Sequence, residues 1–296
     1  MDWQSLILTQ AVLVALATVA TRVLAREKKT DDSALAVTAG WFVVLYAVGL
    51  AILPFVARPH LFSLETYWWR FLLGGIAFTL TNVFTYYSLV YLEVSIATIL
   101  STMSALFTFF GAAIFIHEDL SSRQLIGSFF LLAAIIYTIL ATRHRPTRAV
   151  HRKLAIGFSF ALLSAIFYGI ASVNEKSLLG HVSVGDYILF GWFGEMSMAL
   201  LLVLILRPKS LKVLKDPFTL RWTVTIGILR ATSGLCFILA LIRSNNVALM
   251  TVLSNFRLVI VVLLGVVFLK ERQRITQKLA GSALATLALA IMFWQK

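Results

Sequence analysis

The sequence predicts an all-α integral membrane protein in which ten transmembrane helices form a 5+5 inverted repeat. Three observations support this prediction. First, the 296 residues are 60% hydrophobic and only 13% charged, a composition that does not fit a water-soluble globule. Second, ten apolar runs are each long enough to cross a hydrocarbon core of about 30 Å. Third, the last five runs repeat the pattern of the first five.

Each run is expected to form a helix, because backbone polar groups in lipid must find their hydrogen-bond partners within the same segment. Short polar connections separate the runs. In the first half the expected helices span residues 4–24, 34–57, 66–90, 94–116 and 123–141. In the second half they span residues 154–174, 185–206, 220–242, 246–269 and 275–294.

The basic residues predict which way these helices point. Most of the 26 Lys and Arg lie in the connections after the first, fifth, seventh and ninth runs, which all belong to one face of the membrane. Because positively charged loops stay in the cytosol, we expect a multi-pass protein of the cell (inner) membrane with both termini outside the cytoplasm. The first residues, MDWQSLILTQ, contain no basic residue, so we expect no cleaved signal peptide. The net charge of +13 does not indicate nucleic-acid binding, because the basic residues lie between apolar runs.

An internal duplication relates the two halves. The stretch IATILSTMSALFTFFGAAIFIHEDLSSRQLIGS, from Ile96 to Ser128, aligns with LMTVLSNFRLVIVVLLGVVFLKERQRITQKLAGS, from Leu249 to Ser282. Since five is an odd number, the second copy must enter the bilayer upside down. We therefore expect a five-helix repeat at residues 1–141, a basic linker at residues 142–153 and a second five-helix repeat at residues 154–296. Inverted repeats are typical of carriers, and channels are the alternative within this architecture.

Short motifs recur at matching places in the two halves, around the turn after the third run, at the end of the fourth run and at the start of the fifth. They are Ser88-Leu89 and Ala240-Leu241, Glu118 and Lys270-Glu271-Arg272, and Gln124–Gly127 and Gln277–Gly281. In these motifs nearly the whole chain resembles the EamA-type transporters of the drug/metabolite transporter superfamily. The resemblance implies a 5+5 arrangement of ten helices, alternating access, export, and a central cavity walled by the first, third and fourth helices of each half.

Three charged residues fall near the middle of predicted spans, namely Arg230, Arg257 and Glu195. A charge at the bilayer midplane is costly, so each should face protein or water rather than lipid. Two arginines against one glutamate leave one cation without a fixed counter-ion, unless Glu175 reaches inward. A buried pair of Arg230 with Glu195, without contact to any substrate, is an open alternative.

A guanidinium in a wet cavity is a natural site for a carboxylate or phosphate, which it binds through two parallel hydrogen bonds. Amide side chains at this depth need partners, and aromatic rings can contact a substrate, whereas hydroxyl residues at helical spacing also occur in ordinary helix packing. Trp41, Trp68 and Trp69 are interpreted as interface anchors. The candidate substrate-binding residues are Arg230, Arg257, Asn82, Tyr86, Asn255, Ser254, Ser101, Phe237 and Trp192, and Glu195 is the candidate coupling group.

These features predict a secondary active transporter that exports a small carboxylate-bearing or zwitterionic metabolite, such as an amino acid, by alternating access. The expected partners are this small molecule, the lipid bilayer and, through Glu195, protons. No catalytic residue, cofactor or metal is expected. The single Cys236 lacks Cys/His spacing for a metal, and no phosphate loop or nucleophile elbow occurs. The alternative from another class is a membrane-embedded enzyme or lipid-handling protein that holds a phosphorylated lipid with the arginines.

Overall fold

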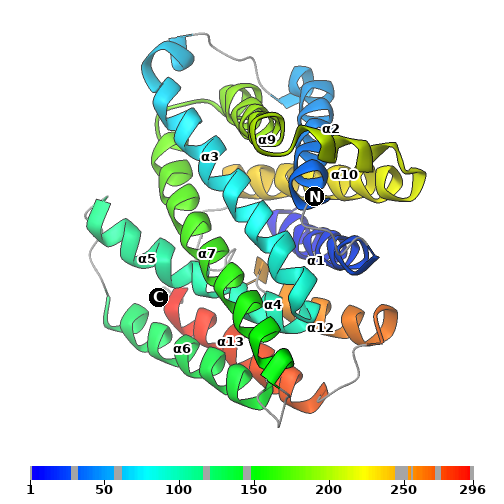
Figure 1. Ribbon diagram of the computed structural model, residues 1–296. Coiled ribbons are helices and arrows are strands. Elements are labelled where there is room, and N and C mark those ends of the chain that lie inside the picture. The colour runs from blue at the N-terminus through cyan, green and yellow to red at the C-terminus, as the bar shows by residue number, and fades with distance from the viewer. Residues whose placement is uncertain are drawn as a thin grey trace.

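The computed structural model describes residues 2–27, 33–56, 62–115, 121–142, 148–243, 253–254, 256–270 and 275–293, and these residues contain helices and no strand. Figure 1 shows the helices crossing one another in a single bundle. The helices are α1 (Trp3–Glu27), α2 (Ser33–Val56), α3 (Phe62–Tyr91), α4 (Val94–Ser101), α5 (Met103–Phe115), α6 (Ser122–Thr142), α7 (Arg148–Leu179), α8 (Val184–Asp186), the π-helix η1 (Tyr187–Gly191), α9 (Trp192–Leu206), the 3₁₀-helix η2 (Pro208–Lys215), α10 (Pro217–Arg243), α12 (Arg257–Phe268) and α13 (Ile275–Phe293).

Helical residues occupy parts of all ten predicted ranges, so the prediction of an all-helical membrane protein is confirmed. Within the described residues, seven helices are long and apolar enough to cross a membrane. The helices at residues 122–138, 257–268 and 275–291 are apolar but shorter. The number of ten crossings therefore stays a prediction. α7 begins at Arg148, so the second part of the segment predicted as a linker is helical.

The fourth expected helix of each half is broken. In the first half, α4 ends at Ser101 and α5 begins at Met103, where the Thr102 backbone N–H donates to the Ile99 carbonyl oxygen at 3.1 Å. In the second half, Leu253 and Ser254 are helical and α12 begins at Arg257. The span expected at residues 94–116 is therefore present as one apolar segment, Val94–Phe115, which a tight turn at Thr102 divides into α4 and α5. Ser and Thr hydroxyls compete with the helical hydrogen bonds at the first break, because Ser101 and Thr102 donate to carbonyls three residues earlier.

The helix contacts between the two halves are symmetric, because each contact has a counterpart in which the two halves have changed roles. α1 packs against α10, and α3 packs against α7, so each third helix meets the first helix of the other half. α2 contacts α9, α4 contacts α12 and α6 contacts α13, and each of these pairs joins corresponding helices. Figure 1 shows α6 and α13 side by side, away from α2 and α9. The packing thus has the approximate two-fold pattern of a duplicated unit.

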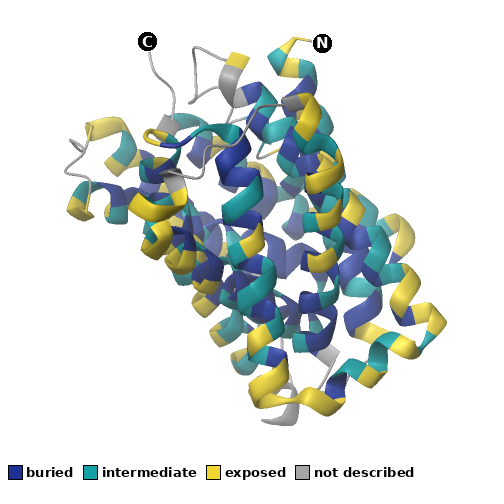
Figure 2. Cartoon of the chain, turned by 90° about the horizontal axis from the view of Figure 1, so that it is seen from above, coloured by how far each residue is buried: buried dark blue, intermediate teal, exposed yellow. Residues whose placement is uncertain are grey.

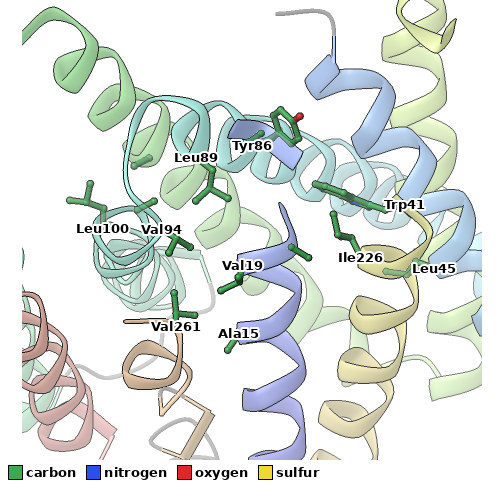
Figure 3. Packing of buried hydrophobic residues seen from close by; sticks show 14 of the residues in the cluster. Ala15, Val19, Trp41, Leu45, Tyr86, Leu89, Val94, Leu100, Ile226 and Val261 are labelled. Carbon is green, nitrogen blue, oxygen red and sulfur yellow. The ribbon is translucent and has the colours of Figure 1, made fainter. Parts of the chain in front are cut away.

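The hydrophobic core lies along α1. Figure 3 shows Val19 of α1 between Leu89 of α3 on one side and Ile226 of α10 on the other. Figure 2 shows the buried residues inside the bundle and many exposed residues on its outer surface and at helix ends. Large exposed apolar side chains on the outside are expected where lipid, not water, is the solvent. The core thereby joins the first half to the second through one central helix.

Two glycines allow α3 and α9 to approach closely. A Cβ atom added at Gly75 of α3 would lie 2.6 Å from the carbonyl oxygen of Gly194 of α9. Because that oxygen belongs to the backbone of a helix, it has little freedom to move away. Small residues at a contact between membrane helices are a recurring device for close packing. This contact places the start of α9 against the middle of α3.

Gly75→Ala is expected to destabilise the protein by about 1–3 kcal/mol, because the added methyl group forces α3 and α9 apart. Gly180→Ala is the matched control, since a Cβ there would meet only the Ser177 carbonyl oxygen at an ordinary 3.6 Å. Thermal unfolding of both variants in detergent micelles measures the difference, and a midpoint for Gly75→Ala equal to that of Gly180→Ala would contradict the close contact.

Candidate substrate-binding site

Arg230 is the central charged group of the site. It lies in α10, and its Nη1 donates a hydrogen bond to Oδ1 of Asn82 in α3 at 2.7 Å. Asn82 presents that oxygen because its Nδ2 donates to the Phe78 carbonyl oxygen at 2.8 Å. The Arg230 Cζ atom lies 4.8 Å from the ring centre of Trp41 in α2. One amide and one aromatic face therefore replace water around this guanidinium.

The hydrogen-bonding capacity of Arg230 is not used up by these contacts. Its Nε is buried and has no hydrogen-bond partner. The described residues place no carboxylate oxygen within 4.0 Å of its guanidinium, so the predicted alternative of a direct ion pair with Glu195 is not formed. Glu195 still lies close enough for its charge to act on that of Arg230. A buried donor without a partner is costly, and an anionic ligand is one group that would satisfy it.

Arg257 is the second cation of the site. It is the first residue of α12, directly after the break in the fourth helix of the second half, and it is half-buried. Within the described part of the chain it makes no hydrogen bond and no ion pair. Its charge acts on Arg230. Two guanidiniums that repel each other and have no carboxylate in contact create a positive region between the halves.

Glu195 lines a small cavity together with a second acid. The cavity has a volume of about 10 Å³ and is lined by Glu195 of α9, Glu175 of α7 and Tyr187 of η1, together with residues of α3 that include Arg70. This space suits about one water molecule. Glu175 and Tyr187 form a side-chain hydrogen bond. Two carboxyl groups, a phenol and the guanidinium-bearing Arg70 therefore border one small cavity.

Local structure fixes where Glu195 points. It follows the π-helix η1 by one turn, and an inserted residue of this kind rotates the side chains after it about the helix axis. Thr79 of α3 donates to the Glu195 backbone carbonyl oxygen at 3.1 Å. Together with the approach of Gly75 to Gly194, this bond holds the first turn of α9 against α3. π-helical turns occur frequently at functional sites.

The remaining predicted site residues are spread more widely. Ser254 donates to Oε1 of Gln10 in α1 at 3.0 Å, and Ser101 donates within its own helix to the Thr98 carbonyl oxygen at 2.7 Å. Tyr86 is fully buried in the main hydrophobic cluster. Phe237 packs on a small separate cluster that includes residues of α1.

Trp192 and Asn255 complete the set of predicted binding residues. The buried ring of Trp192 lies against Gly49 of α2 and Gly234 of α10. Asn255 lies outside the described residues. Arg230 thus interacts with three other predicted site residues. It donates a hydrogen bond to Asn82, and its charge acts on those of Arg257 and Glu195.

The prediction that Trp41 is an interface anchor is wrong. An interface anchor would be exposed, yet the exposed fraction of Trp41 is 0% and the guanidinium of Arg230 lies over its ring. Its position two turns inside the second expected helix is a signal that it is too deep for the interface. Trp68 and Trp69 are 58% and 47% exposed, as expected of anchors. Glu175 reaches inward because α7 continues to Leu179, beyond the predicted end of that helix.

The fold and the site define a multi-pass helical membrane protein built from two related halves around a buried charged centre. A sequence model of the EamA-like transporter family matches residues 2–140 and again residues 155–294, once in each half. The chain therefore belongs to the EamA-like transporter family, within the drug/metabolite transporter superfamily.

Two further similarities agree with this assignment. The chain is 33% identical over 131 residues to the uncharacterized vacuolar membrane protein YML018C of Saccharomyces cerevisiae. That match covers 40% of this chain and 33% of the relative, so it spans about a third of the relative's length. A protein of known crystal structure aligns over 98% of this chain and 94% of its own, with a TM-score of 0.65 and 17% identity. At this identity the second likeness shows the shared fold alone.

Asn82→Leu is expected to cost about 1–3 kcal/mol of stability, because it leaves a charged donor of Arg230 without its acceptor. In the Arg230→Met background the same substitution should cost at least 1 kcal/mol less, since the donor is gone. Thermal unfolding of the two single variants and the double variant completes the cycle. An equal cost of Asn82→Leu in both backgrounds would show that the Arg230–Asn82 bond does not contribute.

Proposed function

We propose that this chain is a ten-helix secondary transporter that moves a small carboxylate-bearing or zwitterionic metabolite, such as an amino acid, by alternating access of two inverted halves. Membership of a transporter family gives the class. The arrangement of Arg230 and Arg257 supports a substrate with a negative group. The proposed direction is export, and the proposed location is the cell membrane with both termini outside the cytoplasm, as the distribution of basic residues suggests.

The observation that carries the proposal is the position of Arg257 at the helix break. In transporters built from inverted repeats, broken helices at corresponding positions of the two halves surround the binding site. Here the breaks near Thr102 and before Arg257 fall at corresponding positions, and α4 and α12 are in contact. The N-terminus of a helix carries the positive end of the helix dipole, which favours a negative group there, and the Phe256 N–H before α12 itself donates to the Leu253 carbonyl oxygen at 3.1 Å. Arg257 adds a full positive charge at the same place.

The charges around the site support a zwitterion. The charges of Arg230 and Arg257 act on each other, and the carboxyl groups of Glu195 and Glu175 line one small cavity that Arg70 also borders. A substrate with a carboxylate and an ammonium group matches both signs, whereas a phosphate or a dicarboxylate matches only the arginines. We therefore favour an amino acid or a similar zwitterion among the candidate substrates.

We also propose that Glu195 couples transport to protons. Ionisable residues inside membrane segments are rare and are typical of proton relays. Glu195 lines the cavity with Glu175 and Tyr187, and its charge acts on that of Arg230, so binding of an ammonium group and binding of a proton would compete for the same carboxylate. Such competition is the basis of exchange, because the substrate leaves when the proton enters.

Arg257→Gln is expected to weaken substrate binding about 10- to 100-fold, because it removes a charge-assisted contact to the carboxylate. A thermal-shift screen of amino acids, organic acids, amines and sugar phosphates identifies the ligand, and uptake into liposomes then gives KM. Arg221→Gln, at an exposed arginine near the start of the same half's α10, is the matched control. If folded Arg257→Gln transports with the KM of the control, the proposed anion site is wrong.

Glu195→Gln is expected to abolish the response of transport to an imposed pH gradient, because glutamine cannot exchange a proton. Exchange of substrate for substrate, without net proton movement, should continue in the variant. Uptake into liposomes with and without a pH gradient measures both activities. If the wild-type protein transports at the same rate in both conditions, Glu195 is not a coupling group.

A further inference from the structure

A second cavity differs from the charged centre because its lining is almost entirely apolar. It has a volume of about 230 Å³ and lies between α2, α9, α10 and the 3₁₀-helix η2. Leu211 and Leu214 line it from η2. Val43 of α2 and Leu220 of α10 also line it and are 40% and 48% exposed, so the cavity borders the outside of the bundle. In a membrane protein this outer surface meets lipid.

The helix η2 separates its charged and apolar side chains into two rows. A 3₁₀-helix has three residues per turn, so residues three apart lie directly above one another. Lys209, Lys212 and Lys215 form one such row, and all three are exposed. Leu211 and Leu214 form the next row and line the cavity. A helix of this kind suits the boundary between head groups and acyl chains, with lysines in water and leucines in the apolar layer.

The neighbourhood of η2 is strongly positive. Exposed arginines flank the lysine row on both sides, at Arg207 and Arg221. The single acid within this stretch, Asp216, accepts hydrogen bonds from the Thr219 backbone N–H at 3.2 Å and from its hydroxyl at 2.7 Å. It therefore caps α10 and is committed to that role. A row of lysines above an apolar cavity is complementary to a molecule with a negative head and an apolar tail.

We propose that this cavity is a binding site for one anionic phospholipid. The lysine row of η2 holds the phosphate and head group, and one acyl chain enters the cavity past Val43 and Leu220. A soluble anion would use the lysines but not the cavity, and a neutral lipid would use the cavity but not the lysines. The proposal is independent of the transported substrate, because none of its residues belongs to the charged centre.

Native mass spectrometry of the full chain in detergent tests the proposal with dioleoyl phosphatidylglycerol and dioleoyl phosphatidylcholine. We expect one phosphatidylglycerol molecule to be retained at concentrations at least tenfold below those needed for phosphatidylcholine. Lys212→Gln/Lys215→Gln should lower the affinity for phosphatidylglycerol by roughly five-fold for each lysine removed. The matched control, Arg152→Gln/Lys153→Gln, removes two exposed charges from the start of α7 and should leave the affinity unchanged.

The cavity is tested separately from the charges. Val43→Trp should block the entrance and weaken binding of phosphatidylglycerol at least tenfold, whereas Leu50→Trp, at a similarly exposed position of α2 outside the cavity, should not. Glycerol phosphate, which has the charge without the chains, should not displace the lipid. Equal retention of the two lipids, equal effects of a variant and its control, or displacement by glycerol phosphate would each overturn the proposal.

Discussion

A permanent positive charge inside the bundle constrains how three helices meet. The guanidinium of Arg230 does not lose its proton, and an arginine at the bilayer centre costs at least about 2.5–3.5 kcal/mol. Asn82 of α3 and the ring of Trp41 of α2 offset part of this cost from the first half of the chain. Because α10 belongs to the second half, the contacts that tolerate the charge also join the two halves. Any movement of one half relative to the other must therefore change the surroundings of Arg230.

The pairing of helices is compatible with the proposed alternating access. α1 against α10 and α3 against α7 are corresponding contacts, so a rocking motion that loosened one pair would tighten the other and bury a similar kind of surface. Contacts between corresponding helices, such as α2 with α9 and α6 with α13, lie on the approximate two-fold axis and can act as pivots. The backbones of α3 and α9 are in close contact at Gly75 and Gly194, which leaves little room for one helix to shift against the other. We therefore expect α3 and the start of α9 to move together.

The sequence was sufficient to predict the helical ranges, because hydropathy reports depth in the bilayer. It also predicted that Arg230, Arg257 and Glu195 lie inside, for the same reason. It did not predict what each side chain faces, because that depends on rotation about the helix axis and on breaks in the helix. The helix break at Thr102 follows from local hydroxyl bonds, and the burial of Trp41 follows from packing against the other half. Neither feature can be predicted from the mean hydropathy of a window of residues.

The inward position of Glu175 changes the charge balance from which the anion site was first inferred. Arg70 lines the same cavity as the two acids, so three guanidiniums stand against two carboxyl groups. The opposite charges are kept apart, since no carboxylate oxygen of the described residues lies within 4.0 Å of the guanidinium of Arg230 or Arg257. Glu195 is held at its place by the Thr79 bond to its backbone and by the cavity shared with Tyr187. Separated charges that could have paired leave both signs available, and the proposed zwitterionic substrate would match both.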